Sequence, residues 1–106
     1  MSTKNITLIS ETLDYTLVKS GVKCNSSDQL LVLFTSLAEC ADKCREITEC
    51  RFFIFGIEGQ KGECWWEKTK NRECPEGWEE DEYDFYEMIG KFKRITVFIG
   101  VYFLLV

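Results

Sequence analysis

Six cysteines are the residues of this 106-residue chain whose type and spacing best support a defined chemistry. Four lie in one stretch with the spacing C-x3-C-x5-C-x13-C and the other two flank it, at Cys24, Cys40, Cys44, Cys50, Cys64 and Cys74. An even number of cysteines in a short chain is typical of disulfides formed in an oxidising compartment. A reduced protein with buried thiols is the alternative. A zinc site is disfavoured because the chain has no histidine and no Cys-x-x-Cys pair.

Residues suited to catalysis are scarce. There is no histidine for acid–base work near neutral pH, no Gly-x-Ser-x-Gly elbow and no phosphate-binding loop. The acidic run Glu76–Asp84 lacks the ligand spacing of a calcium loop and is typical of a solvated surface segment, although it also suits a basic partner or weak calcium binding. The net charge of −5 disfavours nucleic acid as a partner. We expect neither enzyme activity nor a cofactor or metal.

The elements that must position the cysteines begin with a helix. Ser36, followed three residues later by Glu39, forms a capping box, which satisfies backbone N–H groups at a helix start. Apolar residues then recur at helical spacing, at Leu37, Cys40, Ala41, Cys44 and Ile47. The pattern therefore places Cys40 and Cys44 one turn apart on the same face of a helix that ends near Ile47.

The segments around this helix have strand patterns, with alternating apolar residues or runs rich in aromatic and β-branched residues. We predict strands at Ile6–Ser10, Tyr15–Lys19, Leu31–Phe34, Cys50–Ile57, Glu63–Lys68 and Glu82–Ile89. The dipeptide Ser20-Gly21 is expected to end the second strand, and Thr69–Asp81 is expected to be a long surface loop.

Several of these segments together resemble the PAN/apple domain family. The resemblance rests on SLAECADKC, ECRFFIFG and GEC, with YTLVKSGVKC like the family's opening strand and EYDFYEMI like its closing strand. It implies an α+β fold for residues 5–90: a small disulfide-rich domain with one α-helix packed on an antiparallel β-sheet. It also implies the pairs Cys40–Cys64, Cys44–Cys50 and Cys24–Cys74. Functionally it implies a non-catalytic extracellular binding or adhesion module for a protein or carbohydrate ligand.

Two sets of residues are candidates for ligand binding. The family's Cys-x-x-Phe-x-Phe motif directs Phe53 and Phe55 towards the helix, so that Phe52, Ile54 and Trp65 form an apolar patch on the outer face of the sheet. The alternative is that another part of the chain, most obviously its C-terminus, covers them. The second set is cationic and lies close together in the sequence. It would suit an anionic sugar and consists of Lys61, Lys68, Lys70 and Arg72.

The cellular location follows mainly from the cysteines, which predict the extracellular space or the secretory lumen. Sequons for N-glycosylation at Asn5 and Asn25 agree with this expectation. The first ten residues show no signal peptide, so a leader is expected to be missing from the sequence.

Residues 91–106 form a basic cluster and an apolar tail, Ile95–Val106, which is short for a membrane span. The tail is a truncated span, an extra strand or helix on the sheet, or a chain end without function. Contact with a membrane through it gives the alternative function, a small membrane-tethered structural subunit of a larger assembly. The sequence leaves the oligomeric state open.

Overall fold

The computed structural model describes residues 7–10, 13–90 and 95–98. The chain divides into two compact units, residues 15–89 and a second unit from residues 1–14 and 90–106. In the second unit, strands β1 (Thr7–Ser10) and β7 (Ile95–Phe98) form an antiparallel pair. The domain predicted for residues 5–90 includes Thr7–Ser10. The structure instead pairs this strand with β7.

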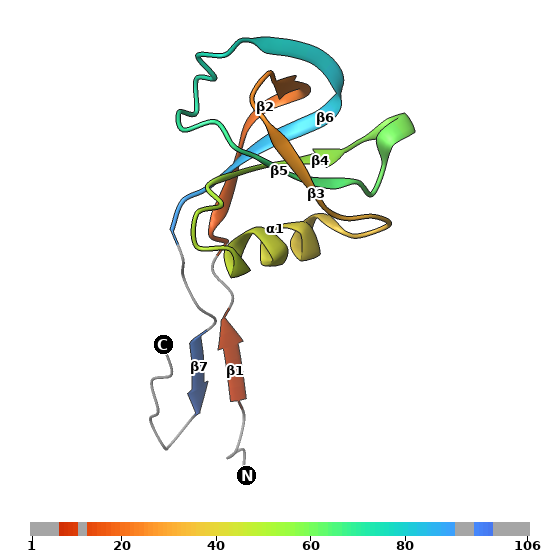
Figure 1. Ribbon diagram of the computed structural model, residues 1–106. Helices are drawn as coiled ribbons and strands as arrows, with labels where there is room; N and C mark the ends of the chain where they lie inside the picture. The colour runs from red at the N-terminus through yellow and green to blue at the C-terminus, as the bar shows by residue number, and fades with distance from the viewer. Residues whose placement is uncertain (1–6, 11–12, 91–94, 99–106) are drawn as a thin grey trace. The chain divides into compact units, whose positions relative to one another are not determined.

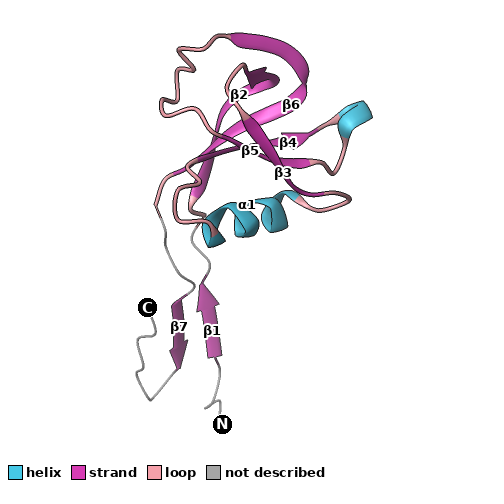
Figure 2. Cartoon of the chain, viewed as in Figure 1, coloured by secondary structure: helices cyan, strands magenta, loops and turns pink. Residues whose placement is uncertain are grey.

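The first unit is one helix on a five-stranded antiparallel sheet (Figures 1 and 2). The sheet has the order β2-β6-β4-β5-β3, with β4 at its centre. Helix α1 spans Leu37–Glu46, and a short 3-10 turn, η1, spans Glu58–Gln60 in the β4–β5 connection. The strands are β2 (Tyr15–Cys24), β3 (Asp28–Val32), β4 (Phe52–Gly56), β5 (Cys64–Glu67) and β6 (Trp78–Met88). The predicted class, a small disulfide-rich α+β domain, is confirmed.

The helix begins where the capping box predicts. The Glu39 backbone N–H donates to the Ser36 hydroxyl oxygen at 3.2 Å, and the Ser36 N–H donates to the Glu39 carboxylate at 3.4 Å. The helix buries its Cys40 and Cys44 face against the sheet. Local capping and apolar spacing therefore determine both the start of the helix and the side that packs.

Three disulfides cross-link this unit, pairing Cys24 with Cys74, Cys40 with Cys64, and Cys44 with Cys50. No cysteine is left free. The pairing is the one that the family resemblance implies. Two bridges lie at the helix and the third joins the end of β2 to the β5–β6 loop. Three disulfides indicate an oxidising environment, secretory or extracellular.

Both faces of the sheet are buried, because alternate residues of the central strands enter two separate cores. On the helix side, Phe53 stacks on Tyr86 with 5.1 Å between ring centroids. On the other side, Phe52 stacks on Phe85 at 5.4 Å. The second core also contains Val22, Cys24, Ile54, Cys74 and Tyr83.

The predicted bounds of three strands were wrong. Strand β2 does not end at Gly21 but continues to Cys24 through register shifts on either side of residues 19–20. Gly21 accommodates the second shift with φ +75°, and its N–H donates to the Asp84 carboxylate at 3.1 Å. Because the longer β2 supplies pairing partners, β6 begins at Trp78, inside the loop expected to reach Asp81. Strand β3 begins at Asp28 and ends at Val32, earlier than Leu31–Phe34.

Only part of the apolar tail lies within the described residues. Ile95–Phe98 form β7, while the rest of the tail and Asn5 lie outside the described residues. The described residues contain no helix with the length and hydrophobicity that a membrane span requires.

We predict that Gly56→Ala destabilises the domain. A Cβ at Gly56 would lie 1.7 Å from the Gln60 carbonyl oxygen, so backbone must move. The expected loss in the free energy of unfolding is about 1–3 kcal/mol, the usual cost of overpacking. Urea denaturation with the disulfides intact measures it.

The matched control is Gly59→Ala in the same connection. The atoms nearest to its Cβ would be those of the Glu82 carboxylate, at the end of a side chain that can rotate away. We expect a change within about 0.5 kcal/mol for this variant. An equal loss in both variants would contradict the assignment of the cost to the Gly56–Gln60 contact.

Candidate functional site

A pocket of about 570 Å³ lies where the α1–β4 loop, the end of β5 and the β5–β6 loop meet. We call it the Trp66 pocket. Its lining residues are Thr48, Glu49, Arg51, Trp66, Lys68, Thr69 and Lys70. The volume falls within the range of about 300–1,000 Å³ typical of ligand sites.

Three elements hold this pocket together. Trp66 lies on β5 between Gln29 of β3 and Phe53 of β4, and it packs against the helix-side core. The Cys44–Cys50 bridge closes the loop that carries Thr48 and Glu49. The other wall follows directly from the end of β5, where the Lys68 N–H donates to the Ser27 carbonyl at 2.8 Å. The pocket is therefore built on hydrogen-bonded and cross-linked backbone.

The pocket combines an aromatic face with positive charge. The Lys68 ammonium lies 4.5 Å from the centroid of the Trp66 ring, within the range of a cation–π contact. Trp66 is only partly buried. An indole with one cation already beside it offers a ligand both a flat apolar surface and a charge.

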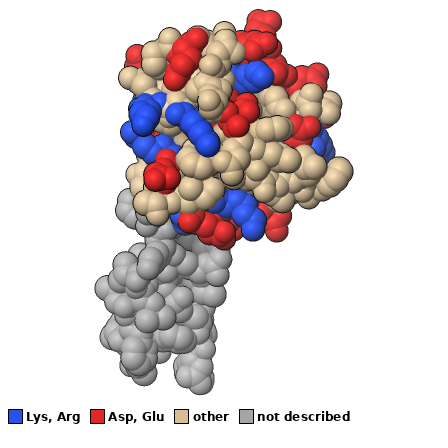
Figure 3. Space-filling view, in the orientation of Figure 1, with Lys and Arg blue, Asp and Glu red and all other residues tan. Residues whose placement is uncertain are grey.

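Cations outnumber carboxylates in and beside the pocket. Its lining carries Arg51, Lys68 and Lys70 against Glu49 alone. Nearby, Glu87 contacts both Arg72, at 2.9 Å, and Arg51, at 3.7 Å. In Figure 3 several basic side chains lie together on the left of the visible face, and others are scattered over the rest of it. This excess of positive charge is local, because the whole chain carries a net charge of −5.

The four predicted cations divide between two places. Lys68 and Lys70 line the pocket, and Arg72 lies near it through the shared contact with Glu87. Lys61 lies in the β4–β5 connection, which precedes β5, so it is at the opposite end of that strand. The predicted cluster is therefore wrong for Lys61.

Arg51 was missed by the sequence analysis. The antiparallel pairing of Phe52 with Glu67 brings Arg51, just before β4, close to Lys68, just after β5. No local pattern reports such a contact, because it joins residues far apart in the chain. The only available signal was a basic residue next to a strand in the cysteine-rich stretch.

The predicted outer apolar patch was also wrong. Phe52 and Ile54 point away from the helix as expected, but they are 0% and 1% exposed. Trp65 is partly buried beside them. Within the described residues, their cover is the second core, including the Cys24–Cys74 bridge and Tyr83. Phe52 and Ile54 therefore stabilise the fold and do not present a surface to a ligand.

Glu67 is a buried carboxylate on the sheet face opposite Trp66. One carboxylate oxygen accepts a hydrogen bond from the Ser26 hydroxyl at 2.8 Å, and the other accepts one from the Cys24 N–H at 3.2 Å. Burial raises the pKa of Glu67 from its ordinary value of 4.5 to about 7, and the nearby Asp28 carboxylate adds to this increase. Glu67 thus anchors the turn that follows β2.

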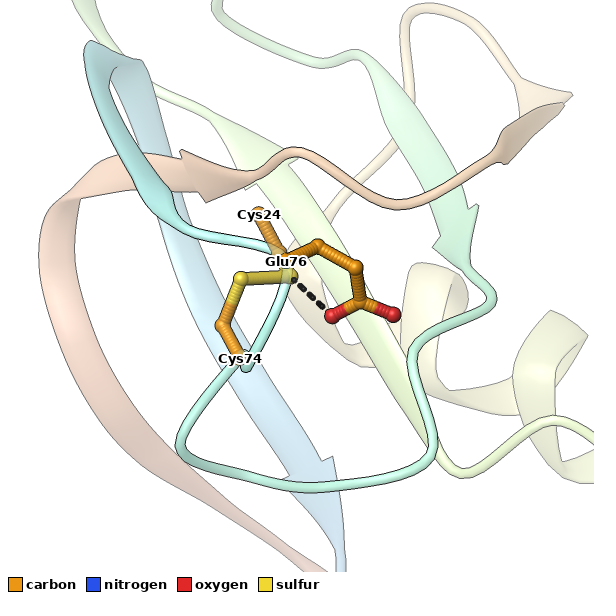
Figure 4. A group of neighbouring side chains, drawn as sticks. All are labelled: Cys24, Cys74 and Glu76. Atoms are coloured by element: carbon orange, nitrogen blue, oxygen red, sulfur yellow. Dashed lines mark hydrogen bonds between the residues drawn. A yellow bond between two sulfur atoms is a disulfide. The ribbon is translucent and has the colours of Figure 1, made fainter.

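Cys24, Cys74 and Glu76 form a close group that looks like a metal site in its composition (Figure 4). Both sulfur atoms are committed to a disulfide, so neither is a thiolate ligand. The Glu76 carboxylate lies 3.5 Å from the Cys24 sulfur and accepts a hydrogen bond from the Thr69 hydroxyl at 2.8 Å. Its role is to close the β5–β6 loop.

The sequon at Asn25 lies in the turn between β2 and β3. Asn25 is exposed, and its backbone N–H donates to the Gly77 carbonyl at 2.9 Å. The position of the turn therefore leaves the asparagine side chain accessible for a glycan.

Comparison of this chain with protein-family models, with curated proteins and with solved structures finds no match.

We predict that Glu67 makes stability pH-dependent. Because its pKa is higher in the folded than in the unfolded chain, the folded state binds this proton more tightly. Its contribution to the free energy of unfolding is complete below pH 4.5 and is lost as the pH rises through about 7. Denaturant unfolding at a series of pH values between about 4.5 and 8 should show this decline.

Glu67→Gln is the test variant, because it retains the shape of the side chain without the titrating group. We expect the free energy of unfolding of this variant to change less over the same pH range. Identical pH profiles for the two proteins would show that Glu67 does not carry the effect.

Proposed function

We propose that this chain is a non-catalytic extracellular binding module of the PAN/apple type that holds an anionic carbohydrate in the Trp66 pocket. The observation that carries the proposal is the excess of cations around an exposed part of an indole ring, in a chain that is acidic as a whole. A protein ligand with clustered carboxylates would use the same charges and is the competing partner.

The chemistry of the lining favours a sugar. Ligand sites combine apolar or aromatic surface with a few polar groups that fix orientation. Trp66 supplies the flat surface against which the apolar face of a pyranose ring can lie. The Thr48 hydroxyl and the Glu49 carboxylate are hydrogen-bonding groups of the kind that sugar hydroxyls need.

The cations favour a ligand that carries carboxylate or sulfate groups. Arginine binds such groups through its planar array of N–H donors, and lysine acts as a compact point charge. Arg51, Lys68 and Lys70 come from two different loops, so the pocket presents positive charge from two sides. A neutral sugar would gain no charge–charge attraction from these cations.

The PAN/apple assignment within this proposal is supported by the disulfide pairs and by the helix that carries two of the half-cystines. The helix packs on an antiparallel sheet whose central strand contains the Phe52–Gly56 motif. The disulfides also support an extracellular or secretory location.

Isothermal titration of the oxidised chain with a heparin-derived hexasaccharide and with neutral chitohexaose tests the function. We expect binding of the sulfated sugar only. Trp66→Ala and the double variant Lys68→Ala/Lys70→Ala should each weaken it by about tenfold or more, equivalent to roughly 1.4 kcal/mol. Trp66→Phe, which keeps an aromatic face, should retain most of the affinity.

Lys61→Ala is the matched control, because it removes one exposed lysine from the other end of β5. Its affinity should equal that of the unaltered protein. Equal losses in Lys61→Ala and in a single Lys68→Ala variant would indicate non-specific attraction of charge. Equal binding of both sugars, or of neither, would refute an anionic sugar as the ligand.

A further inference from the structure

The loop between β3 and α1 exposes an aromatic side chain. Phe34 is 95% exposed, and the preceding Leu33 is 45% exposed. Phe34 also has φ 54°, a left-handed conformation that is unfavourable for a bulky residue. We call Leu33 and Phe34 the Phe34 finger. Residues kept in such a conformation and exposed to water are often found at binding sites.

The finger is held in place from outside its own loop. The Thr35 N–H donates to the Gly62 carbonyl at 3.1 Å. Gly62 has φ +86°, which favours glycine, and a Cβ there would lie in tight contact, 3.2 Å from the Phe34 Cα. The β4–β5 connection therefore supports the finger in its exposed position.

A groove with more carboxylates than cations lies beside the finger. The groove, of about 380 Å³, runs from Val32–Thr35 along helix α1, where it is lined by Glu39, Asp42, Lys43 and Glu46. The hydrogen bond from the Thr35 hydroxyl, at 2.8 Å, lowers the pKa of Glu39 and keeps its carboxylate ionised. Asp42 pairs with Arg45 but its side chain remains 60% exposed. The face beside the finger is thus aromatic and acidic.

The Trp66 pocket has the complementary character, aromatic and basic, at the other end of the helix. The finger precedes the first residue of α1, whereas Thr48 and Glu49 of the pocket follow its last (Figure 1). A helix of this length, 10 residues, extends about 15 Å. Phe34 and the Trp66 pocket therefore lie beyond opposite ends of the helix.

We propose that the Phe34 finger of one molecule enters the Trp66 pocket of a second copy of this chain. Phe34 would lie against the indole, and Asp42 and Glu46 would face Lys68 and Lys70 of the neighbour. Such a contact joins two different surfaces, so each molecule retains a free finger and a free pocket, and the association continues head to tail. This association uses the same pocket as the proposed function, so it would compete with sugar binding. The proposal does not depend on sugar binding.

A contact made by one finger and one pocket is small, so the association is expected to be weak. Sedimentation equilibrium of the full oxidised chain should be followed up to about 1 mM, where millimolar dissociation constants become measurable. We expect the weight-average mass to rise above the 12.4 kDa of the single chain. Phe34→Ala should keep the protein monomeric over the same range.

A charge exchange makes the test specific. One variant, Asp42→Lys/Glu46→Lys, makes the groove beside the finger basic. The other, Lys68→Glu/Lys70→Glu, makes the pocket acidic. Each variant should be monomeric alone. Mixed together, the two variants should associate, because the basic groove beside the finger of the first variant meets the acidic pocket of the second. Restored association in the mixture also shows that both variants are folded.

The matched control for Asp42→Lys/Glu46→Lys is Glu79→Lys/Glu80→Lys. It changes the net charge by the same amount, on exposed residues of β6. It should associate like the unaltered protein. A constant mass of 12.4 kDa for the unaltered protein would overturn the proposal. Association that Phe34→Ala leaves unchanged, or a mixture that stays monomeric, would overturn it too. Because Phe34 lies outside the pocket, sugar titration of Phe34→Ala separates failure of this proposal from failure of the proposed function.

Discussion

The covalent connection between helix and sheet is the constraint on which the rest of this structure depends. The unit has one helix, and Cys40–Cys64 attaches that helix to β5, while Cys44–Cys50 ties its end to the chain entering β4. Bridges of this kind contribute about 2–4 kcal/mol each, comparable with a large part of the 5–15 kcal/mol that stabilises a domain. They also fix where the α1–β4 loop lies against the end of β5. The Trp66 pocket therefore depends directly on the same two bridges that secure the helix.

The third bridge has a different consequence, because it closes the sheet face that the helix does not cover. One face of an antiparallel sheet is commonly exposed to water. Here Cys24–Cys74 joins the end of β2 to the β5–β6 loop, and together with Val22 and Tyr83 it encloses Phe52 and Ile54. Glu67 lies at the margin of this second core and binds the Cys24–Ser26 turn through its carboxylate. The burial of this ionisable group accompanies the closure of the second face.

The distribution of charge gives the small domain two surfaces of opposite character. Basic residues collect around Trp66, although acidic residues predominate in the chain, and carboxylates line the groove next to Phe34. Each surface includes an aromatic side chain accessible to a partner. A soluble anionic ligand and the finger of a second molecule would both satisfy the cations of the pocket. The proposed binding and the proposed association are thus alternative uses of one electrostatic feature, and the ligand concentration would decide between them.

The sequence by itself determined the features that depend on neighbouring residues. The Ser36–Glu39 box and the spacing of Cys40 and Cys44 specify the helix and its buried face. Alternation in β4 separates the side chains of the two sheet faces, and the family motif added which of them face the helix. The cysteine pairs followed only from a family resemblance, because spacing alone permits many connectivities. Tertiary structure alone decided which side chains water reaches. Alternation placed Phe52 opposite the helix, but its burial comes from residues at both ends of the domain. Likewise, strand register brings Arg51 to Lys68 and leaves Lys61 at the far end of β5. Burial and register are set by contacts between residues far apart in the chain, which local periodicity does not report.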